Sequence, residues 1–256
     1  MTTGPVVVAY GMGVDSTALL IGLHQEGITP DLILFADTGD EKPATYAYLP
    51  VISAWLARAG FPPVTVVKNP RPKSGDQSLS DSCLRLGTLP ALAYGKHQCS
   101  LVWKIAPQVA FLKTWRPAIE ARAAGQSVTI LIGYDNSPRD TARRYRAEGK
   151  ATVGSVNGFP LIAWGWDRAA CKSQIVRAGL PLPVKSACFH CPASKPSEII
   201  ALRDTTPHLY AKAIQMEHAA RAKGLRRIAG LGRRFSWESV AAQMSLVSAM
   251  DESEAA

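Results

Sequence analysis

The sequence predicts an α/β fold in which a parallel β-sheet is covered by helices on both faces. Short runs of β-branched and apolar residues recur along the chain, as in VVVA, LILFA and VTVV. Between these runs lie longer segments with helical periodicity, which end at Gly27 and Gly60. Strands that alternate with helices in this way pair in parallel, and their sheet needs a helical layer on each face.

The first part of the chain contains three of the expected strands. They cover residues 5–10, 31–37 and 63–69, and helices are expected over 16–27 and 44–60. Residues 70–100 are rich in Pro, Ser and Gly, so we expect a loop with short helical pieces there.

The second part continues the alternation and then becomes helical. We expect a helix over 106–125 with a kink at Pro117, a strand over 127–135 and a basic, glycine-containing loop over 138–158. Further helices are expected over 168–178 and 207–224. The predicted organisation is an α/β domain over 1–165 and a Cys-containing helical region over 166–256.

The charge is biased toward basic residues. The formal net charge of +9 favours polyanionic partners such as nucleotides, tRNA and DNA. No basic region precedes the first apolar run and Asp15 interrupts it, so a signal peptide is not expected. No apolar run approaches the ~20 residues of a membrane-spanning helix. We therefore expect a cytoplasmic protein with no membrane partner.

The turn GMGVDS, Gly11–Ser16, is a candidate anion site. A glycine-containing turn between a strand and a helix directs backbone N–H groups and the helix N-terminus toward an anion. Asp15 and Ser16 can cap the helix, and the Ser16 hydroxyl can also reach a phosphate. The alternative is a plain turn with such a cap. The patterns G-x-x-x-x-G-K-[ST] and G-x-G-x-x-G do not match here.

GMGVDS resembles the S-G-G-x-D-S loop of N-type ATP pyrophosphatases (the PP-loop, adenine nucleotide alpha hydrolase-like superfamily). Gly11 stands in place of the first serine and Met12 in place of the first glycine. Within that superfamily the chain resembles the phosphoadenosine-phosphosulfate (PAPS) reductase-like branch. Members of this branch carry a second-strand DTG followed by Thr-Tyr, as in FADTGDEKPATYAYL, and a Cys-to-Lys stretch like CSLVWKIAPQ. The resemblance runs from Val6 to about Trp237 and implies a Rossmann-like (HUP-type) fold.

The resemblance implies that residues 1–165 bind ATP, with AMP and pyrophosphate as products and Mg²⁺ as a cofactor. Asp15 and Ser16 are the expected catalytic residues, and Asp15 or Asp37 is expected to help hold the metal. The strand ends at 37–39 and 133–135 lie where open α/β sheets bind ligands. The predicted nucleotide-binding residues are Gly11, Met12, Gly13, Val14, Asp15, Ser16, Asp37, Thr38, Gly39, Gly133, Tyr134 and Asp135.

Five cysteines in an expected cytoplasmic chain indicate metal or redox chemistry rather than disulfides. Cys188 and Cys191 form a C-x-x-C pair, whose spacing lets two thiolates bind one metal or cluster. Relatives in the PAPS reductase-like branch place a cluster cysteine at the stretch of Cys99. We predict these three as ligands of a [4Fe–4S] cluster or, alternatively, of Zn²⁺, with Cys171 or Cys83 as the fourth. For Cys171 and Cys83, a structural role in the interior is the alternative.

Two groups of basic residues are candidate polyanion contacts. Arg139, Arg143 and Arg144 follow the strand end at 133–135, where they could clamp phosphates. Lys104 is a further expected phosphate or nucleic-acid contact. For the second group, in residues 221–234, a solvated face is the favoured interpretation.

The resemblance therefore implies an adenylating sulfurtransferase that acts on nucleic acid, by DNA phosphorothioation ahead of tRNA thiolation. A cysteine desulfurase is the expected sulfur donor. A PAPS reductase needs a nucleophilic cysteine near its C-terminus, and here no cysteine follows Cys191. Two alternatives stay open: a reductase-like or other small-molecule adenylating enzyme, and a non-catalytic module that binds nucleotide and nucleic acid.

Overall fold

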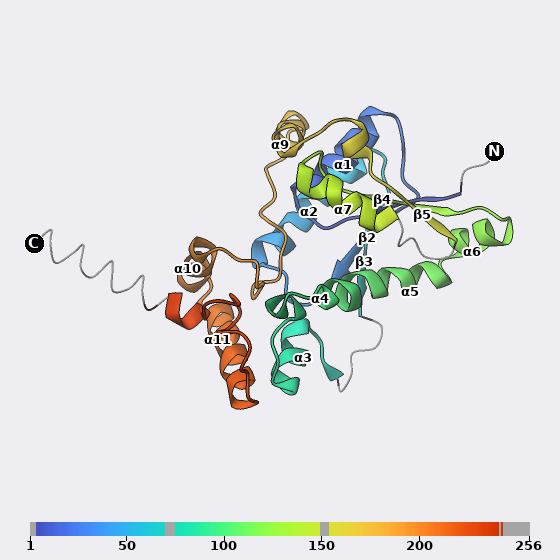
Figure 1. Cartoon of the computed structure of the whole chain (residues 1–256). Coiled ribbons are helices and arrows are strands. Elements are labelled where there is room, and N and C mark those ends of the chain that lie inside the picture. The colour runs from blue at the N-terminus through green and yellow to red at the C-terminus, as the bar shows by residue number, and fades with distance from the viewer. Residues whose placement is uncertain (1–3, 70–74, 149–153, 241, 243–256) are drawn as a thin grey trace, which may run out of the picture. The chain divides into compact units, whose positions relative to one another are not determined.

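The computed structural model describes residues 4–69, 75–148, 154–240 and 242. It confirms the α/β fold class: five parallel strands form one sheet in the order β3-β2-β1-β4-β5 (Figure 1). The strands are β1 (Val6–Ala9), β2 (Leu32–Asp37), β3 (Val64–Lys68), β4 (Val128–Ile132) and β5 (Ser155–Gly158).

The strand order creates a switch point between β1 and β4. From β1 the chain adds β2 and then β3 on one side, and it adds β4 and β5 on the other side. Val8 of β1 is paired with Ile33 of β2 and with Leu131 of β4. In open α/β sheets, ligands bind outside the carboxyl ends of the two strands at such a point.

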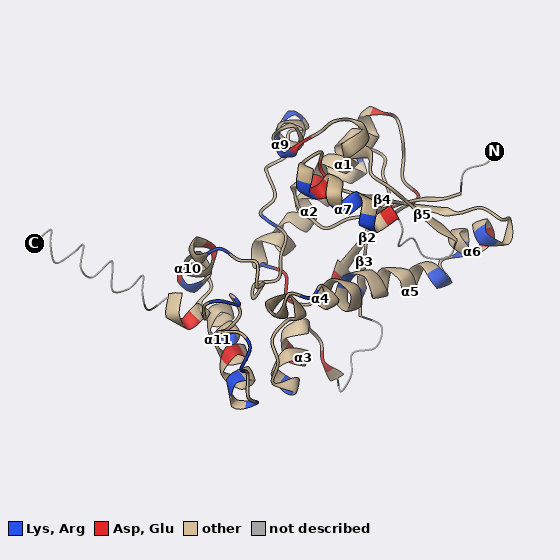
Figure 2. Cartoon of the chain, in the orientation of Figure 1, with Lys and Arg blue, Asp and Glu red and all other residues tan. Residues whose placement is uncertain are grey.

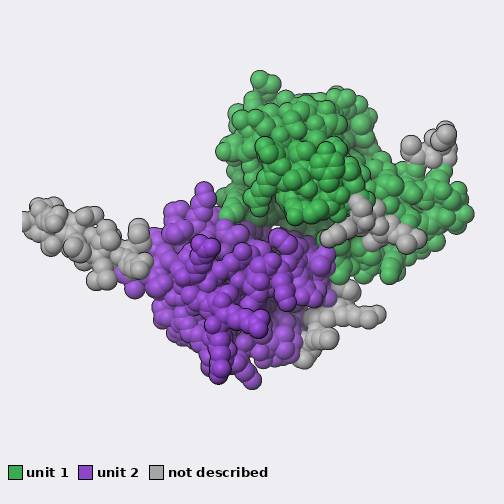
Figure 3. Space-filling view, viewed as in Figure 1, with its two compact units in different colours: residues 1–37, 42–68, 105–186 green, residues 38–41, 69–104, 187–256 purple. Residues whose placement is uncertain are grey.

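The sheet belongs to the first of two compact units, which we call unit 1, residues 1–37, 42–68 and 105–186 (Figure 3). Its helices are α1 (Val14–Gln25), α2 (Pro43–Arg58), α5 (Ala106–Thr114), α6 (Arg116–Ala123), α7 (Pro138–Glu148), α8 (Pro160–Ala163) and α9 (Arg168–Arg177).

Both faces of the sheet are buried, as a parallel sheet requires. Successive residues of a strand point to opposite faces, and the two hydrophobic clusters of unit 1 follow this alternation. Val8 and Ile33 pack in the cluster that includes α1, α2 and α9 residues. Val7 and Leu34 pack in a second cluster with Leu112 of α5.

The second compact unit, unit 2, comprises residues 38–41, 69–104 and 187–256. Its helices are α3 (Leu79–Leu86), the short 3₁₀ helix η2 (Ala91–Tyr94), α4 (Gln98–Ser100), α10 (Pro196–Thr205) and α11 (Pro207–Ala222); the π-helical turn η3 (Leu101–Ile105) spans its end. Its core contains Phe189, Ile199, Met216 and Trp237. The division differs from the predicted boundary after residue 165, because α9 belongs to unit 1 and residues 69–104 belong to unit 2.

The prediction of a loop over 138–158 is wrong for two segments. Residues 138–148 form helix α7, and residues 155–158 form the edge strand β5. Pro138 in the first turn and the hydroxyl of Ser137, which accepts from the Asp140 amide at 3.3 Å, start the helix. The strand has the sequence SVNG, and the hydrophobic pattern of a buried strand is missing from it.

The expected helix over 106–125 is two helices, α5 and α6, that meet at Trp115. Trp115 has an extended backbone (φ −73°, ψ 119°), so the break comes two residues before the predicted kink at Pro117. Among the described helices, none has both the length and the apolar character that a bilayer crossing would require.

Candidate functional site

The turn between β1 and α1 is closed by the side chain of Ser16. Its hydroxyl accepts hydrogen bonds from the amides of Gly11 (3.2 Å) and Gly13 (3.3 Å), and it donates to the Gly13 carbonyl oxygen (3.2 Å). Gly13 is the N-cap of α1, a helix of 12 residues. Two backbone N–H groups therefore converge on one oxygen at a helix N-terminus, an arrangement that suits an anion.

Met12 has a left-handed backbone in this turn, with φ of 55°. That conformation costs a non-glycine residue roughly 1–2 kcal/mol. The Met12 side chain is fully buried in the core of unit 1, which offsets this cost. The Val14 side chain is buried as well. At these two predicted nucleotide-binding positions the backbone, and not the side chain, is available to a ligand.

The end of β4 passes very close to this turn. A Cβ atom on Gly133 would lie 2.8 Å from the Ser16 nitrogen and 3.0 Å from the carbonyl carbon of Asp15. Glycine is therefore required at this position for close backbone approach rather than for an unusual φ. The structure thus brings Gly11–Ser16 and Gly133 together at the switch point of the sheet.

Acidic and basic side chains surround the same turn. The Arg168 Nη1 atom lies 2.5 Å from Asp15 Oδ1. Burial raises the pKa of Asp15 to about 6; Arg168 lowers that pKa, and the carboxylates of Asp135 and Asp140 raise it. A carboxyl group with a pKa this far above its usual range, in the first turn of a helix beside a cation, is typical of functional sites.

An aromatic stack in unit 1 is linked to one of these carboxylates, Asp140, through Arg143. The rings of Tyr134 and Phe159 stack with centroids 5.5 Å apart, and the Arg143 guanidinium lies 4.2 Å from the Tyr134 centroid. Arg143 Nη1 also lies 2.7 Å from Asp140 Oδ1. Arg143 is therefore fixed by a ring and a carboxylate, which leaves it less free to clamp a phosphate than predicted.

The other predicted cationic contacts differ in their partners. Arg144 forms an ion pair with Glu148 at 3.1 Å. Lys104 of unit 2 forms an ion pair at 2.8 Å with Glu41, whose side chain is fully buried. Arg139 is exposed and has no carboxylate partner among the described residues. Of the four, Arg139 is the cation most available to a polyanion.

The second predicted strand end is held by its own neighbours. Asp37 accepts a hydrogen bond from the Tyr46 hydroxyl at 2.6 Å, and Lys68 Nζ lies 3.3 Å from its second oxygen. In unit 2, Gly39 has φ of 75°, and a Cβ atom there would lie 2.8 Å from the Gln77 carbonyl oxygen. Gly39 of the DTG motif is therefore needed for backbone geometry.

Asp40, directly after DTG, is the centre of a buried polar network in unit 2 that the sequence did not reveal. Its Oδ2 atom accepts from the Ser80 amide at 2.6 Å and lies 3.0 Å from His190 Nε2. Its Oδ1 atom accepts from the Ser80 hydroxyl at 2.6 Å. Burial raises the pKa of Asp40, but the hydrogen bonds from His190 and Ser80 outweigh it and hold that pKa below its ordinary value.

We expect Asp40→Ala to destabilise the protein by about 3 kcal/mol, because it leaves a buried amide, a hydroxyl and His190 without their acceptor. Since the folded-state pKa of Asp40 is lowered, its stabilisation is present above the unfolded-state pKa and is lost as pH falls through the folded-state pKa. Urea unfolding followed by tryptophan fluorescence measures this. Asp204→Ala, at an exposed carboxylate, is the control, and equal midpoints for the two variants would contradict the assigned role.

Four of the five cysteines belong to unit 2, and the fifth lies in the core of unit 1. Cys83, Cys99 and Cys188 pack in one hydrophobic cluster of unit 2. Cys171 is fully buried in α9, and burial raises its pKa to about 12. Cys83 is buried as well, and burial raises its pKa to about 12 too, so the choice between Cys83 and Cys171 as a fourth ligand stays a prediction.

The thiols as placed do not form a ligand set. The Cys188 sulfur lies 3.3 Å from the Thr38 hydroxyl, and burial and the carboxylates of Glu41 and Asp40 raise its pKa, while Lys104 lowers it. Among the residues that the structure describes, no three His, Cys, Asp or Glu side chains are grouped as a metal requires. The [4Fe–4S] cluster, Zn²⁺ and Mg²⁺ stay predictions.

Arg168 and Asp40 are residues with polar partners that sequence reasoning missed. Arg168 starts α9 directly after its N-cap, Asp167, and nothing local indicates that it meets Asp15, 153 positions earlier. Asp40 carried a weak signal, because DTGDE places two acidic residues directly after a buried strand. No model of a known protein family matches the chain, and no curated protein is significantly similar to it.

Proposed function

We propose that the protein is an ATP pyrophosphatase-type enzyme that adenylates an oxygen of a nucleic acid, so that sulfur can replace that oxygen. The observation that carries the proposal is the turn at the switch point, where the amides of Gly11 and Gly13 converge on one oxygen beneath Gly133. The raised pKa of Asp15 beside Arg168 supports a reacting centre rather than a plain helix cap.

In the proposed reaction an acceptor oxygen attacks the α-phosphorus of ATP. The bond from that phosphorus to the oxygen bridging to the β-phosphate breaks, and pyrophosphate leaves with the electron pair. The Ser16 hydroxyl holds the amides of Gly11 and Gly13 in place around the phosphates of ATP, and the N-terminus of α1 stabilises the charge that develops on the leaving group. Arg168 supplies a cation beside the turn.

Nucleic acid is the proposed acceptor because of charge. The net charge is +9, and Arg139, which follows the β4 end in unit 1, has no carboxylate partner among the described residues. The four thiols of unit 2 are the proposed sulfur-handling groups. The PAPS reductase-like resemblance supports this choice, with DNA placed ahead of tRNA.

We expect Ser16→Ala to lower ATP-dependent pyrophosphate release by at least about 100-fold, since the turn loses the hydroxyl that orients its amides. Purified protein is incubated with ATP, Mg²⁺ and either DNA or tRNA, and AMP and pyrophosphate are quantified. Thr114→Ala, which removes an exposed helix-end hydroxyl of unit 1, is the matched control. Release of orthophosphate in place of pyrophosphate, or equal rates in the two variants, would contradict the proposal.

A further inference from the structure

A loop of unit 2 carries four arginines and no acidic residue. This arginine loop, residues 225–236, has the sequence LRRIAGLGRRFS and follows α11. In Figure 2 the segment after α11 carries several blue stretches, which mark Lys and Arg. The four side chains are exposed: Arg226, Arg227, Arg233 and Arg234.

The arginines of the loop differ from the rest of unit 2 in their partners. Every described arginine of unit 2 outside the loop pairs with a carboxylate: Arg85 with Asp76, Arg203 with Asp204, and Arg221 with Glu238. Within the loop, none of the four has a carboxylate partner among the described residues; Arg233 Nε donates to the Leu92 carbonyl oxygen at 2.8 Å. Four uncompensated guanidiniums in one short segment repel one another unless an external anion is present.

The loop is held in one conformation from beneath by Glu217 of α11. The buried Glu217 Oε1 atom accepts from the amides of Leu231 (2.7 Å) and Trp237 (3.0 Å). Both of these side chains are buried in the core of unit 2. The loop therefore presents its arginines from a fixed backbone, so that less conformational entropy is lost when they bind.

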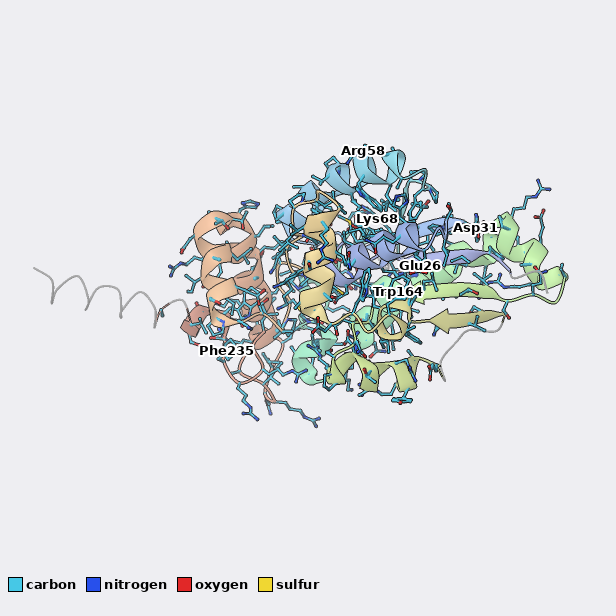
Figure 4. All side chains as sticks on the ribbon, turned by 90° about the horizontal axis from the view of Figure 1, so that it is seen from above. Glu26, Asp31, Arg58, Lys68, Trp164 and Phe235 are labelled. Carbon is cyan, nitrogen blue, oxygen red and sulfur yellow. The ribbon has the colours of Figure 1, made fainter. Side chains whose placement is uncertain are left out.

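Two glycines and one strained residue shape the loop. A Cβ atom on Gly230 would lie 2.8 Å from the Ser236 Cα atom, and one on Gly232 would overlap the ring of Phe235, which is labelled in Figure 4. Arg233 has φ of 65°, in the region that favours glycine. An arginine at a position where glycine would be less strained indicates that its side chain is needed there.

We propose that the arginine loop binds the phosphate backbone of a nucleic acid. Guanidinium groups match phosphate oxygens in bidentate pairs, and contacts of this kind need no base recognition. The loop does not carry the exposed apolar side chains that a membrane-surface segment inserts: Leu225, Ile228 and Phe235 are half-buried, and Leu231 is buried. The further assignment of this loop as the surface that binds the acceptor nucleic acid of the enzyme rests on the proposed function.

The test compares two double variants with the same change in charge. Arg226→Ala/Arg227→Ala removes two loop arginines, and Arg58→Ala/Arg177→Ala removes two exposed arginines of unit 1 that have no ion-pair partner among the described residues. Affinity for a fluorescein-labelled DNA duplex and for labelled tRNA is measured by anisotropy over a series of salt concentrations. The slope of log K against log salt is negative, because salt weakens phosphate contacts. For the duplex, the loop variant is expected to reduce the magnitude of this slope by about 2, and the control variant is expected to leave it unchanged.

A third variant separates binding from folding. Arg233→Gly relieves the left-handed strain, so its melting temperature is expected to stay equal to or above that of the wild type while affinity for nucleic acid falls. Equal salt slopes for both double variants, or binding to phosphatidylserine vesicles without binding to either nucleic acid, would overturn the proposal. Pyrophosphate release in the presence of DNA or tRNA is measured in parallel: its absence in the wild type would count against the proposed function alone, whereas the salt slopes report on the loop.

Discussion

Gly133→Ala is expected to lower ATP-dependent pyrophosphate release by at least about 100-fold. The added Cβ atom would lie 2.8 Å from the Ser16 nitrogen and 3.0 Å from the carbonyl carbon of Asp15, both of them backbone atoms that no rotamer change can move. The β4 end and the turn must therefore separate. Displacement of catalytic groups by a few tenths of an ångström to 1 Å is enough for a loss of this size.

Thr114→Ala, which removes an exposed helix-end hydroxyl of unit 1, is the control. We expect its rate to stay within a few-fold of the wild type, with melting temperatures showing that both variants fold. Full activity in Gly133→Ala would show that the close approach of β4 to the turn is not part of the site.

Asp15→Asn is expected to abolish pyrophosphate release and, at neutral pH, to stabilise the fold. The pKa of Asp15 is raised from an ordinary 3.8 to about 6, chiefly by burial. A raised folded-state pKa means that the contribution to stability is complete below the unfolded-state pKa and is lost as pH rises through about 6. At 1.36 kcal/mol per pKa unit, the ionised group costs about 3 kcal/mol in the folded protein.

The comparison of wild type and Asp15→Asn over pH checks this reasoning. The two free energies of unfolding should coincide below about pH 4, where Asp15 is largely neutral in both states. They should diverge between about pH 4 and pH 6, and above pH 6 the variant should stay more stable by a constant amount. Arg168→Ala removes the cation that lowers the pKa of Asp15, so this pKa should rise further. The free energy of unfolding should then depend on pH over a wider range than in the wild type. A variant that is both inactive and less stable at neutral pH would place Asp15 in a structural role instead.

The sequence allowed the sheet to be predicted because β1 to β4 are apolar and follow helices or turns with clear boundaries. The edge strand β5 was missed because the sequence SVNG has no hydrophobic pattern, and its position is set by pairing with β4. Helix α7 was missed because its composition is strongly basic. Arginine is a good helix former, so charge alone was a poor reason to expect a loop there.

The candidate site could be predicted only in part, because local sequence patterns locate strand ends but do not show which distant residues meet there. Strand ends can be located along a chain, so the turn at Gly11–Ser16 and the end at Gly133 could be expected to meet. Partners that come from distant segments, such as Arg168 for Asp15 or His190 for Asp40, depend on how helices pack. No local pattern encodes a meeting of residues 150 positions apart, as Asp40 and His190 are.

Unit 2 is assembled from three separate stretches of chain, residues 38–41, 69–104 and 187–256. During synthesis the ribosome releases the first two stretches long before the third. Until then Asp40 lacks its partner His190, and α3 lacks the helix α11 that packs against it. Unit 2 therefore closes only after its third stretch has been synthesised, whereas each βα segment of unit 1 can begin to pair as it emerges. Messages truncated before residue 187 should accordingly yield chains in which the apolar residues of the first two stretches of unit 2 stay exposed, and chaperones and proteases should bind such chains.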